Sequence, residues 1–258
     1  MNGPFVDAAE LTRLLGPGAP WQPIEVVEST GSTNDDLMAR PDAPHGLVRI
    51  AAHQTAGRGR FDRVWQALPG TGVAASLVVR PDRPIAQWGW LSLLMGMAVA
   101  EGLRDIGRDA GCDASRVTLK WPNDVLIDDA KVCGVLAQAD GVKAVLGWGL
   151  NIAMTRDELP VPTATSLALA GWPLDATAAV AAVLRQTQHY YTLWADGCDL
   201  RDDHAALSST LGRQLRVERA DGIIEGKAVG LTSSGALLVE TGIPGTVAIE
   251  AGDVTHLR

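Results

Sequence analysis

The chain has 258 residues, of which 47% are hydrophobic, and it carries a formal net charge of −8. This length and apolar content predict a globular protein with a hydrophobic core and exclude wholesale disorder. The negative charge disfavours a general affinity for nucleic acid or for an anionic membrane.

The cysteines and the amino-terminal residues predict a soluble cytoplasmic protein. Cys112, Cys133 and Cys198 are far apart and odd in number, so a disulfide framework or a structural zinc site is not expected. The first residues lack the basic and apolar regions of a secretory signal. The uncharged run 88–100 is too short to span a membrane.

Short strands and helical patterns alternate along the first part of the chain. A short helix is expected to begin near Thr33, because Ser32 and Asp35 have the spacing of a capping box. Apolar residues at helical spacing predict a buried helix from about 84 to 106. Strands are predicted at 24–28, 47–52 and 73–80.

The middle of the chain predicts further strands and a second long helix. The runs 124–127 and 131–139 form a predicted hairpin through a turn at 128–130. The second helix is expected over about 176–194, with Asp175 as its cap. The remaining strands are predicted at 116–121 and 144–153.

The carboxyl-terminal segment differs from the rest of the chain in its pattern of predicted elements. About five short β runs separated by turns follow residue 210, with a hairpin signal at Asp221-Gly222, and together they predict a small barrel. We therefore divide the chain into a larger first domain, 1–209, and a β module, 210–258. The first domain is expected to be α+β, a mixed and mostly antiparallel sheet with helices packed on one side.

A segment rich in arginine and glycine, QTAGRGRFDRVW (54–65), stands out in this acidic chain. Gly57 and Gly59 loosen the backbone and expose its N–H groups, while Arg58, Arg60 and Arg63 supply planar forks that grip carboxylate or phosphate. A solvated turn with surface arginines is an equally good interpretation of composition alone. Neither a Walker A loop nor a G-x-G-x-x-G motif is present, which disfavours the standard nucleotide-binding folds.

Other polar residues around the strands allow both a structural and a functional interpretation. Asn123 and Asp124 are either turn residues or ligands of phosphate, ribose and magnesium. Lys120 and Lys131 are either surface lysines or ligand contacts. The glycines of GWGLN (147–151) serve either close packing or the approach of a flat ligand. The scattered histidines and the lack of a G-x-S-x-G motif argue against zinc catalysis and a hydrolytic triad.

The order of these motifs resembles that of the biotin–protein ligases. Each motif is weak singly, but together they span about 120 residues in register. The departure from the family pattern is at Phe61 and Asp62, where the family usually carries basic residues or glycine. The matching segments are STN (32–34), QTAGRGR (54–60) with Trp65, KWPND (120–124), KVCGVL (131–136) and GWGLN (147–151).

The resemblance implies a fold and a reaction. The fold would be a class II synthetase-like ligase domain followed by an SH3-like barrel, without the helix-turn-helix repressor domain of some family members. ATP would activate the biotin carboxylate as biotinyl-5′-AMP, with Mg²⁺ on the pyrophosphate. A lysine of a biotin carboxyl carrier domain would then attack the mixed anhydride.

The resemblance also implies a role for individual residues. Lys131, Arg60 and Asp124 are expected to be catalytic, with Mg²⁺ near Asp124. Biotin is expected to contact Ser32, Thr33, Asn34, Gln54, Arg58, Gly59, Arg60, Lys131, Gly134 and Gly149. ATP and the adenylate are expected to contact Arg58, Arg60, Arg63, Trp65, Asn123, Lys131 and Asn151.

Three alternatives remain open from the sequence. A lipoate– or octanoate–protein ligase would share the fold, although it usually carries a glycine run and a His-Asp element that this chain lacks. A nucleic-acid-binding module would use the Arg/Gly segment and the barrel, but the acidic balance disfavours it. An inactive adaptor that only docks carrier domains is the third.

Overall fold

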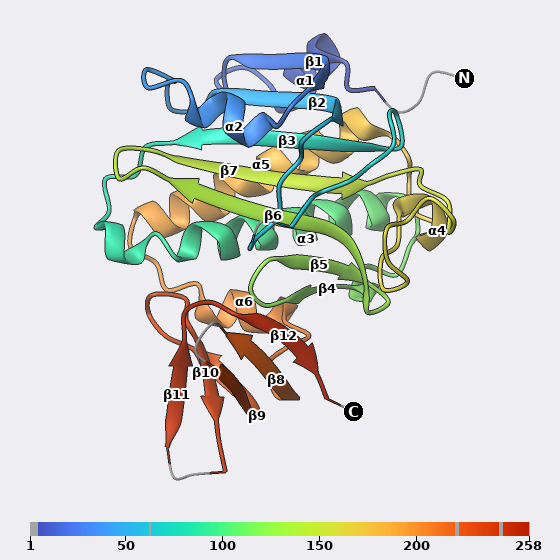
Figure 1. Ribbon diagram of the computed structural model, residues 1–258. Coiled ribbons are helices and arrows are strands. Elements are labelled where there is room, and N and C mark those ends of the chain that lie inside the picture. Colours follow the sequence, from blue (N-terminus) through green and yellow to red (C-terminus); the bar gives the residue numbers. More distant parts are fainter. Residues whose placement is uncertain (1–4, 62, 220–221, 243–244, 258) are drawn as a thin grey trace.

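The computed structural model describes residues 5–61, 63–219, 222–242 and 245–257, so that Asp62 and Asp221 lie outside it. A large sheet carries the helices, and a second, smaller sheet lies below it (Figure 1). The mixed α+β architecture and the separate β module match the fold expected from the sequence. No helix in the described part of the chain is long and apolar enough to cross a bilayer.

The large sheet has seven strands in the order β1-β2-β3-β7-β6-β5-β4. Strands β1 and β2 pair in parallel, and every other neighbouring pair is antiparallel. The β5–β6 hairpin confirms the one predicted through the turn at 128–130. The strands are β1 (Ile24–Thr30), β2 (Val48–Gln54), β3 (Gly72–Val79), β4 (Val117–Lys120), β5 (Asp124–Ile127), β6 (Ala130–Ala139) and β7 (Ala144–Asn151).

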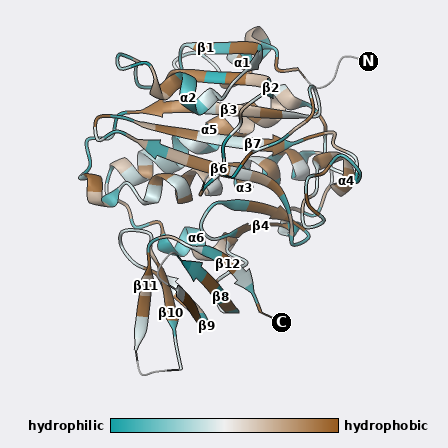
Figure 2. Cartoon of the chain, viewed as in Figure 1, coloured by the Kyte–Doolittle hydropathy of each residue, from teal (hydrophilic) through white to brown (hydrophobic). Residues whose placement is uncertain are grey.

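Two long helices, α3 and α5, cover one face of this sheet (Figure 1). Along β7 the residues alternate between faces, so Leu146, Trp148 and Leu150 join the main core with these helices. Figure 2 shows hydrophobic residues along the central strands β3 and β7. The helices are α1 (Ala8–Leu15), α2 (Thr33–Met38), α3 (Trp90–Asp109), α4 (Leu167–Ala170), α5 (Ala176–Ala195) and α6 (Arg201–Leu207), with 3₁₀ turns at Ile85–Gln87 and Ala114–Arg116.

The opposite face of the sheet is largely open, apart from α2. The expectation that all helices lie on one side is wrong for this helix, because its Leu37 packs into a separate cluster with Val78 and Val145. These two valines point away from the main core, since side chains alternate along a strand. Helix α2 therefore covers part of this face, and Asn34 in its first turn lies against Gly147.

Capping explains where α2 lies. Ser32 accepts a hydrogen bond from the backbone N–H of Asp35 at 3.3 Å, which confirms the predicted cap. At the other end, the fully buried Lys143 donates from Nζ to the carbonyls of Leu37 at 2.9 Å and Met38 at 3.2 Å. The helix is thus fixed at both ends, with its first turn directed at the open face.

The β module forms a five-stranded antiparallel sheet in the order β11-β10-β9-β8-β12. The change from helix to strand falls between α6 and β8, and the division at 209/210 remains a prediction. Two indole groups of the first domain bond to the module: Trp90 Nε1 donates to Ser233 O at 2.9 Å, and Trp121 Nε1 donates to Gly235 O at 3.3 Å. The strands are β8 (Gln214–Arg219), β9 (Gly222–Leu231), β10 (Leu237–Glu240), β11 (Thr246–Ile249) and β12 (Asp253–His256).

Candidate active site

A cavity of about 610 Å³ lies on the open face of the large sheet. The Arg/Gly segment covers it in front, and β8 and β12 of the β module contribute Glu218 and Asp253 to its wall. Lys120 lines it as well. Every residue to which the sequence assigned a role lines this cavity: Ser32, Thr33, Asn34, Gln54, Arg58, Gly59, Arg60, Arg63, Trp65, Asn123, Asp124, Lys131, Gly134, Gly149 and Asn151.

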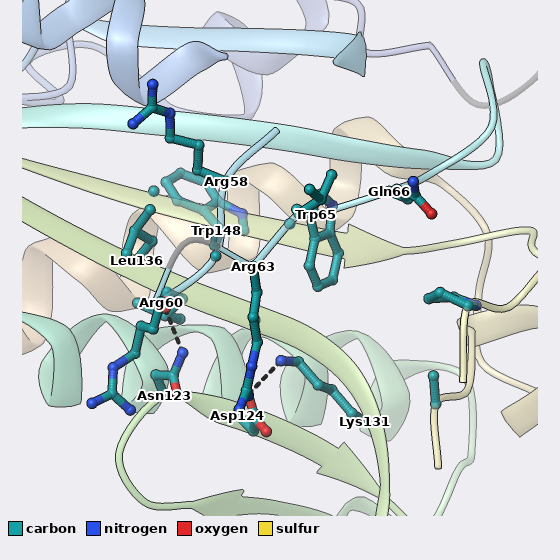
Figure 3. Close-up of a pocket in the computed structure, with 18 of the residues that line it drawn as sticks. Arg58, Arg60, Arg63, Trp65, Gln66, Asn123, Asp124, Lys131, Leu136 and Trp148 are labelled. Atoms are coloured by element: carbon teal, nitrogen blue, oxygen red, sulfur yellow. Dashed lines mark hydrogen bonds and ion pairs between the residues drawn. The ribbon is translucent and has the colours of Figure 1, made fainter. Parts of the chain in front are cut away.

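The sheet order brings the motifs together. Strands β7, β6 and β5 are neighbours, and the register places Gly134 opposite Gly149 on one side and opposite Asp124 on the other. Lys131 lies on the same strand as Gly134, and its Nζ is 2.6 Å from Asp124 Oδ1. Figure 3 shows the Lys131 side chain pointing toward Asp124, with the ion pair between them drawn as a dashed line. A strand-borne amine therefore shares one cavity with the arginine segment.

The glycines form a floor beneath an aromatic ring. A Cβ atom at Gly149 would lie 2.3 Å from Cε2 of Trp65, and one at Gly134 would lie 3.1 Å from Cζ3 of the same indole. Only glycine leaves room for the ring at position 149. The Nζ of Lys131 is 5.7 Å from the Trp65 ring centroid, which is within cation–π range. In this structure Trp65, and not open space, covers the two glycines.

The arginine segment folds back on itself as a short hairpin. Gly59 N donates to Arg63 O at 2.7 Å, and Trp65 N donates to Gly57 O at 2.9 Å. Phe61 at the turn has a φ of 54°, and the Arg60 guanidinium carbon lies 4.7 Å from its ring centroid. Phe61 therefore covers a cation that the sequence assigned to the ligand.

Each of the three arginines has an acidic or carbonyl partner. Arg58 Nε is 2.9 Å from Asp35 Oδ2. Arg60 Nη1 donates to Gly252 O at 3.3 Å, while Arg63 pairs with Asp253. Burial lowers the pKa of Arg60 from its ordinary value, and the carboxylates of Asp253 and Asp124 act in the opposite direction. The segment is thus attached to α2 at one end and to the β module at the other.

The two asparagines of the motifs are oriented by backbone carbonyls. Asn123 Nδ2 donates to Val135 O at 2.9 Å, and Asn151 Nδ2 donates to Thr165 O at 3.0 Å. Because a backbone carbonyl only accepts, each Oδ1 atom points elsewhere. Both residues therefore keep a side-chain acceptor free of these bonds.

Sequence reasoning missed several residues around the cavity. Glu218 and Asp253 supply carboxylates that no motif contains, and the Asp253 contact joins residues 190 positions apart. Asp35 was considered only as part of a helix cap, and its ion pair with Arg58 was not foreseen. Ser76 of β3 and Gln138 of β6 form hydrogen bonds with the side chain of Asn34. Ser76 did leave a signal, since it is the single hydroxyl in the apolar run VAASLVV.

Comparisons with known proteins agree with this geometry. The model of the Biotin/lipoate A/B protein ligase family matches residues 24–151, and that of the Biotin protein ligase C terminal domain matches residues 210–257. The chain is 38% identical to a biotin–[acetyl-CoA-carboxylase] ligase of Mycobacterium tuberculosis, over all of this chain and 98% of that relative. It is 35% identical to a bifunctional ligase/repressor of Bacillus subtilis, over 84% of this chain and 68% of that one.

A comparison with a solved structure agrees with these sequence matches. The biotin protein ligase from Aquifex aeolicus in complex with biotin and ATP superimposes with a TM-score of 0.76 at 25% identity, covering 92% of this chain and 99% of that one. The match therefore extends over both the large sheet and the β module. Together with the full-length sequence match, it shows that the chain belongs to the biotin protein ligases of the Biotin/lipoate A/B protein ligase family.

Proposed function

We propose that the chain is an ATP-dependent biotin–[biotin carboxyl carrier protein] ligase. It activates biotin as biotinyl-5′-AMP and transfers the biotinyl group to a lysine of a biotin carboxyl carrier domain, in the cytoplasm. The observation that carries this proposal is the single cavity shared by Lys131, the arginine segment and the glycine floor. The names of relatives, which include an acetyl-CoA-carboxylase ligase, support the choice of a carboxylase as partner.

The first step brings two anions together, which explains the cations. A biotin carboxylate oxygen attacks the α-phosphorus of ATP, the bond to the bridging oxygen breaks, and pyrophosphate leaves. Arg58, Arg60 and Lys131 hold carboxylate and phosphate against their mutual repulsion, and Arg63 assists. Lys131 and Arg63 now pair with Asp124 and Asp253, so these cations exchange a protein carboxylate for a substrate anion.

The second step is aminolysis of the mixed anhydride. The carrier lysine, as a neutral amine, attacks the acyl carbon, an amide forms, and AMP leaves with the bonding electron pair. The amine must lose a proton, and Asp124 is the carboxylate that receives or orients it. Trp65 covers the adenylate and keeps water away from the anhydride. Asn123 and Asn151 offer their free carbonyl oxygens to the nucleotide.

Magnesium would arrive with the phosphates of ATP. No cluster of three metal-ligating side chains exists among the described residues. That fits Mg²⁺, which commonly uses one or two carboxylates together with substrate phosphates and water. Asp124 would hold the ion, which neutralises charge on the pyrophosphate.

Biotin occupies the part of the cavity around the first turn of α2. Ser32, Thr33 and Gln54 supply hydroxyl and amide groups for the ureido ring, and Gly134 and Gly149 supply backbone. The match of residues 210–257 to the C-terminal domain of biotin protein ligases favours biotin over lipoate or octanoate as the acyl group.

The decisive experiment is transfer of labelled biotin to a purified carrier domain, with ATP and with lipoate as competitor. Lys131→Ala and Arg60→Ala are expected to lower the rate by about 100-fold or more, because each removes a charge-stabilising donor. Lys227→Ala, on β9 outside the cavity, is the matched control. Undiminished transfer by both cavity variants would refute the catalytic roles of Lys131 and Arg60, and incorporation of lipoate in place of biotin would refute the substrate.

A further inference from the structure

A chain of buried polar side chains runs behind the first turn of α2. Ser76 of β3 is fully buried, and its Oγ is 2.7 Å from Thr33 Oγ1 and 2.6 Å from Asn34 Oδ1. Asn34 Nδ2 lies 3.1 Å from Leu136 O and 2.8 Å from Gln138 Oε1. A Cβ atom at residue 147 would be only 2.0 Å from Asn34 Oδ1, so the asparagine is pressed against bare backbone.

The positions of the hydrogens in this chain follow from the acceptors at its ends. The carbonyl of Leu136 only accepts, so the nitrogen of the Asn34 amide must face it and the oxygen must face Ser76. The single hydroxyl hydrogen of Ser76 is then used for Asn34 Oδ1, because two acceptors do not approach to 2.6 Å without one.

The same sequence of donors and acceptors extends to the residues that line the cavity. The Thr33 hydroxyl lies 2.7 Å from Ser76 Oγ and 3.1 Å from Gln54 Oε1. Because Ser76 has no hydrogen left for the shorter contact, Thr33 supplies it, and Ser76 accepts. The backbone N–H of Thr33 donates to Gln54 Oε1 at 2.7 Å, which fixes the orientation of that amide as well. Within the described residues, Gln54 Nε2 donates to no protein acceptor. Thr33 therefore keeps acceptor lone pairs for a ligand, and Gln54 keeps an N–H donor.

We propose that Ser76 is a positioning residue for the biotin subsite, and that Asn34 acts through it instead of bonding the ligand. Their hydrogen bonds hold Thr33 as an acceptor beside Gln54 as a donor. A cyclic urea, which has an N–H beside a C=O, matches this pair. The inference rests on the proposed function, since it names the ligand group that the ordered pair recognises.

The test is calorimetric titration of biotin without nucleotide. Ser76→Ala removes the hydroxyl, leaves Asn34 Oδ1 without its donor and frees the Thr33 hydroxyl to turn. The dissociation constant for biotin is expected to rise about five- to tenfold. The KM for ATP in pyrophosphate exchange at saturating biotin is expected to stay within about twofold of wild type. A purely structural role would move both constants.

Matched variants separate this effect from general destabilisation. Thr187→Val removes an equally buried hydroxyl, which bonds Val183 O inside α5, and is expected to leave biotin binding unchanged. If Ser76→Ala does not fold, two variants of Gln138 test the positioning role instead. Gln138→Leu removes a partner of Asn34 and should weaken biotin binding, whereas Gln138→Glu keeps the acceptor and should restore it.

The outcomes distinguish the inference from the function on which it rests. A wild-type chain that binds no biotin refutes the function. Wild-type binding together with an unchanged dissociation constant in folded Ser76→Ala, or with equal losses in the two Gln138 variants, overturns the positioning role and leaves the function intact.

Discussion

Gly149 has a role that its residue type alone does not reveal. Glycine in a strand weakens the strand, and in β7 the cost is offset because the Trp65 indole rests on the vacant position. The same ring faces Lys131. The absence of a side chain at Gly149 therefore determines the position of the Trp65 indole and, through it, the surroundings of the Lys131 ammonium. Residues that carry no functional group can therefore determine where functional groups lie.

We expect Gly149→Ala to lower the rate of adenylate formation by at least about tenfold, because the added methyl group displaces Trp65 by its overlap with the ring. Gly230→Ala, whose Cβ would meet only one atom at 3.9 Å, is the control and should retain full activity. Pyrophosphate exchange measures the rate, and tryptophan fluorescence reports the displaced indole. Wild-type exchange in Gly149→Ala would show that the ring position is irrelevant to activation.

The arginine segment behaves as one element, a hairpin attached to the protein at each end. The attachments are exposed ion pairs, Arg58 with Asp35 and Arg63 with Asp253, and exposed pairs are weak. Substrate anions can therefore replace them at small cost. The element is held near its working position without being fixed there.

Asp253→Asn is expected to lower the KM for ATP about two- to fivefold, because Arg63 no longer exchanges a carboxylate for phosphate. Asp199→Asn, which breaks an exposed ion pair with Arg201 at the start of α6 and outside the cavity, should leave this constant unchanged. Steady-state exchange kinetics at low ionic strength measure both. An unchanged or raised KM in Asp253→Asn would mean that Asp253 does not compete with the nucleotide.

Elements were more predictable than their arrangement. The cap at Asp175 and the periodicity after it gave α5 almost to the residue, and Ser32 gave the start of α2. Helix α1 was missed, although Asp7 caps it and Glu10 follows at capping-box spacing. The motif residues were found from the sequence, but their convergence depends on the order β7-β6-β5, which no local pattern encodes. The Asp253 contact spans 190 positions and is set by domain packing alone.

Across the whole molecule, the catalytic domain and the β module meet over tryptophans and a buried histidine. His204 of α6 is 1% exposed and packs edge-on against Trp90, which bonds the module. Burial lowers the pKa of His204 to about 4, and burial likewise lowers the pKa of His256 to about 4. Both imidazoles are therefore neutral in the folded protein at neutral pH.

Acid is expected to destabilise this junction. Between the unfolded pKa, about 6.5, and the folded pKa, the unfolded chain binds more protons, so stability falls as the pH is lowered through this window. The melting temperature should drop between about pH 7 and pH 5, and His204→Leu should reduce the drop by removing one of the two groups. Differential scanning calorimetry across this range provides the measurement. An identical drop in the variant would exclude His204 as a cause.

The wall that Glu218 and Asp253 contribute has a practical consequence for protein engineering. A fragment ending before β8 would keep all seven strands of the large sheet, yet its cleft would lack one side and Arg63 its counterion. A foreign terminal domain grafted onto this scaffold would preserve turnover only where the donor closes the same side of the cleft. Chimeras chosen by the residues that form this wall should outperform chimeras chosen by overall similarity.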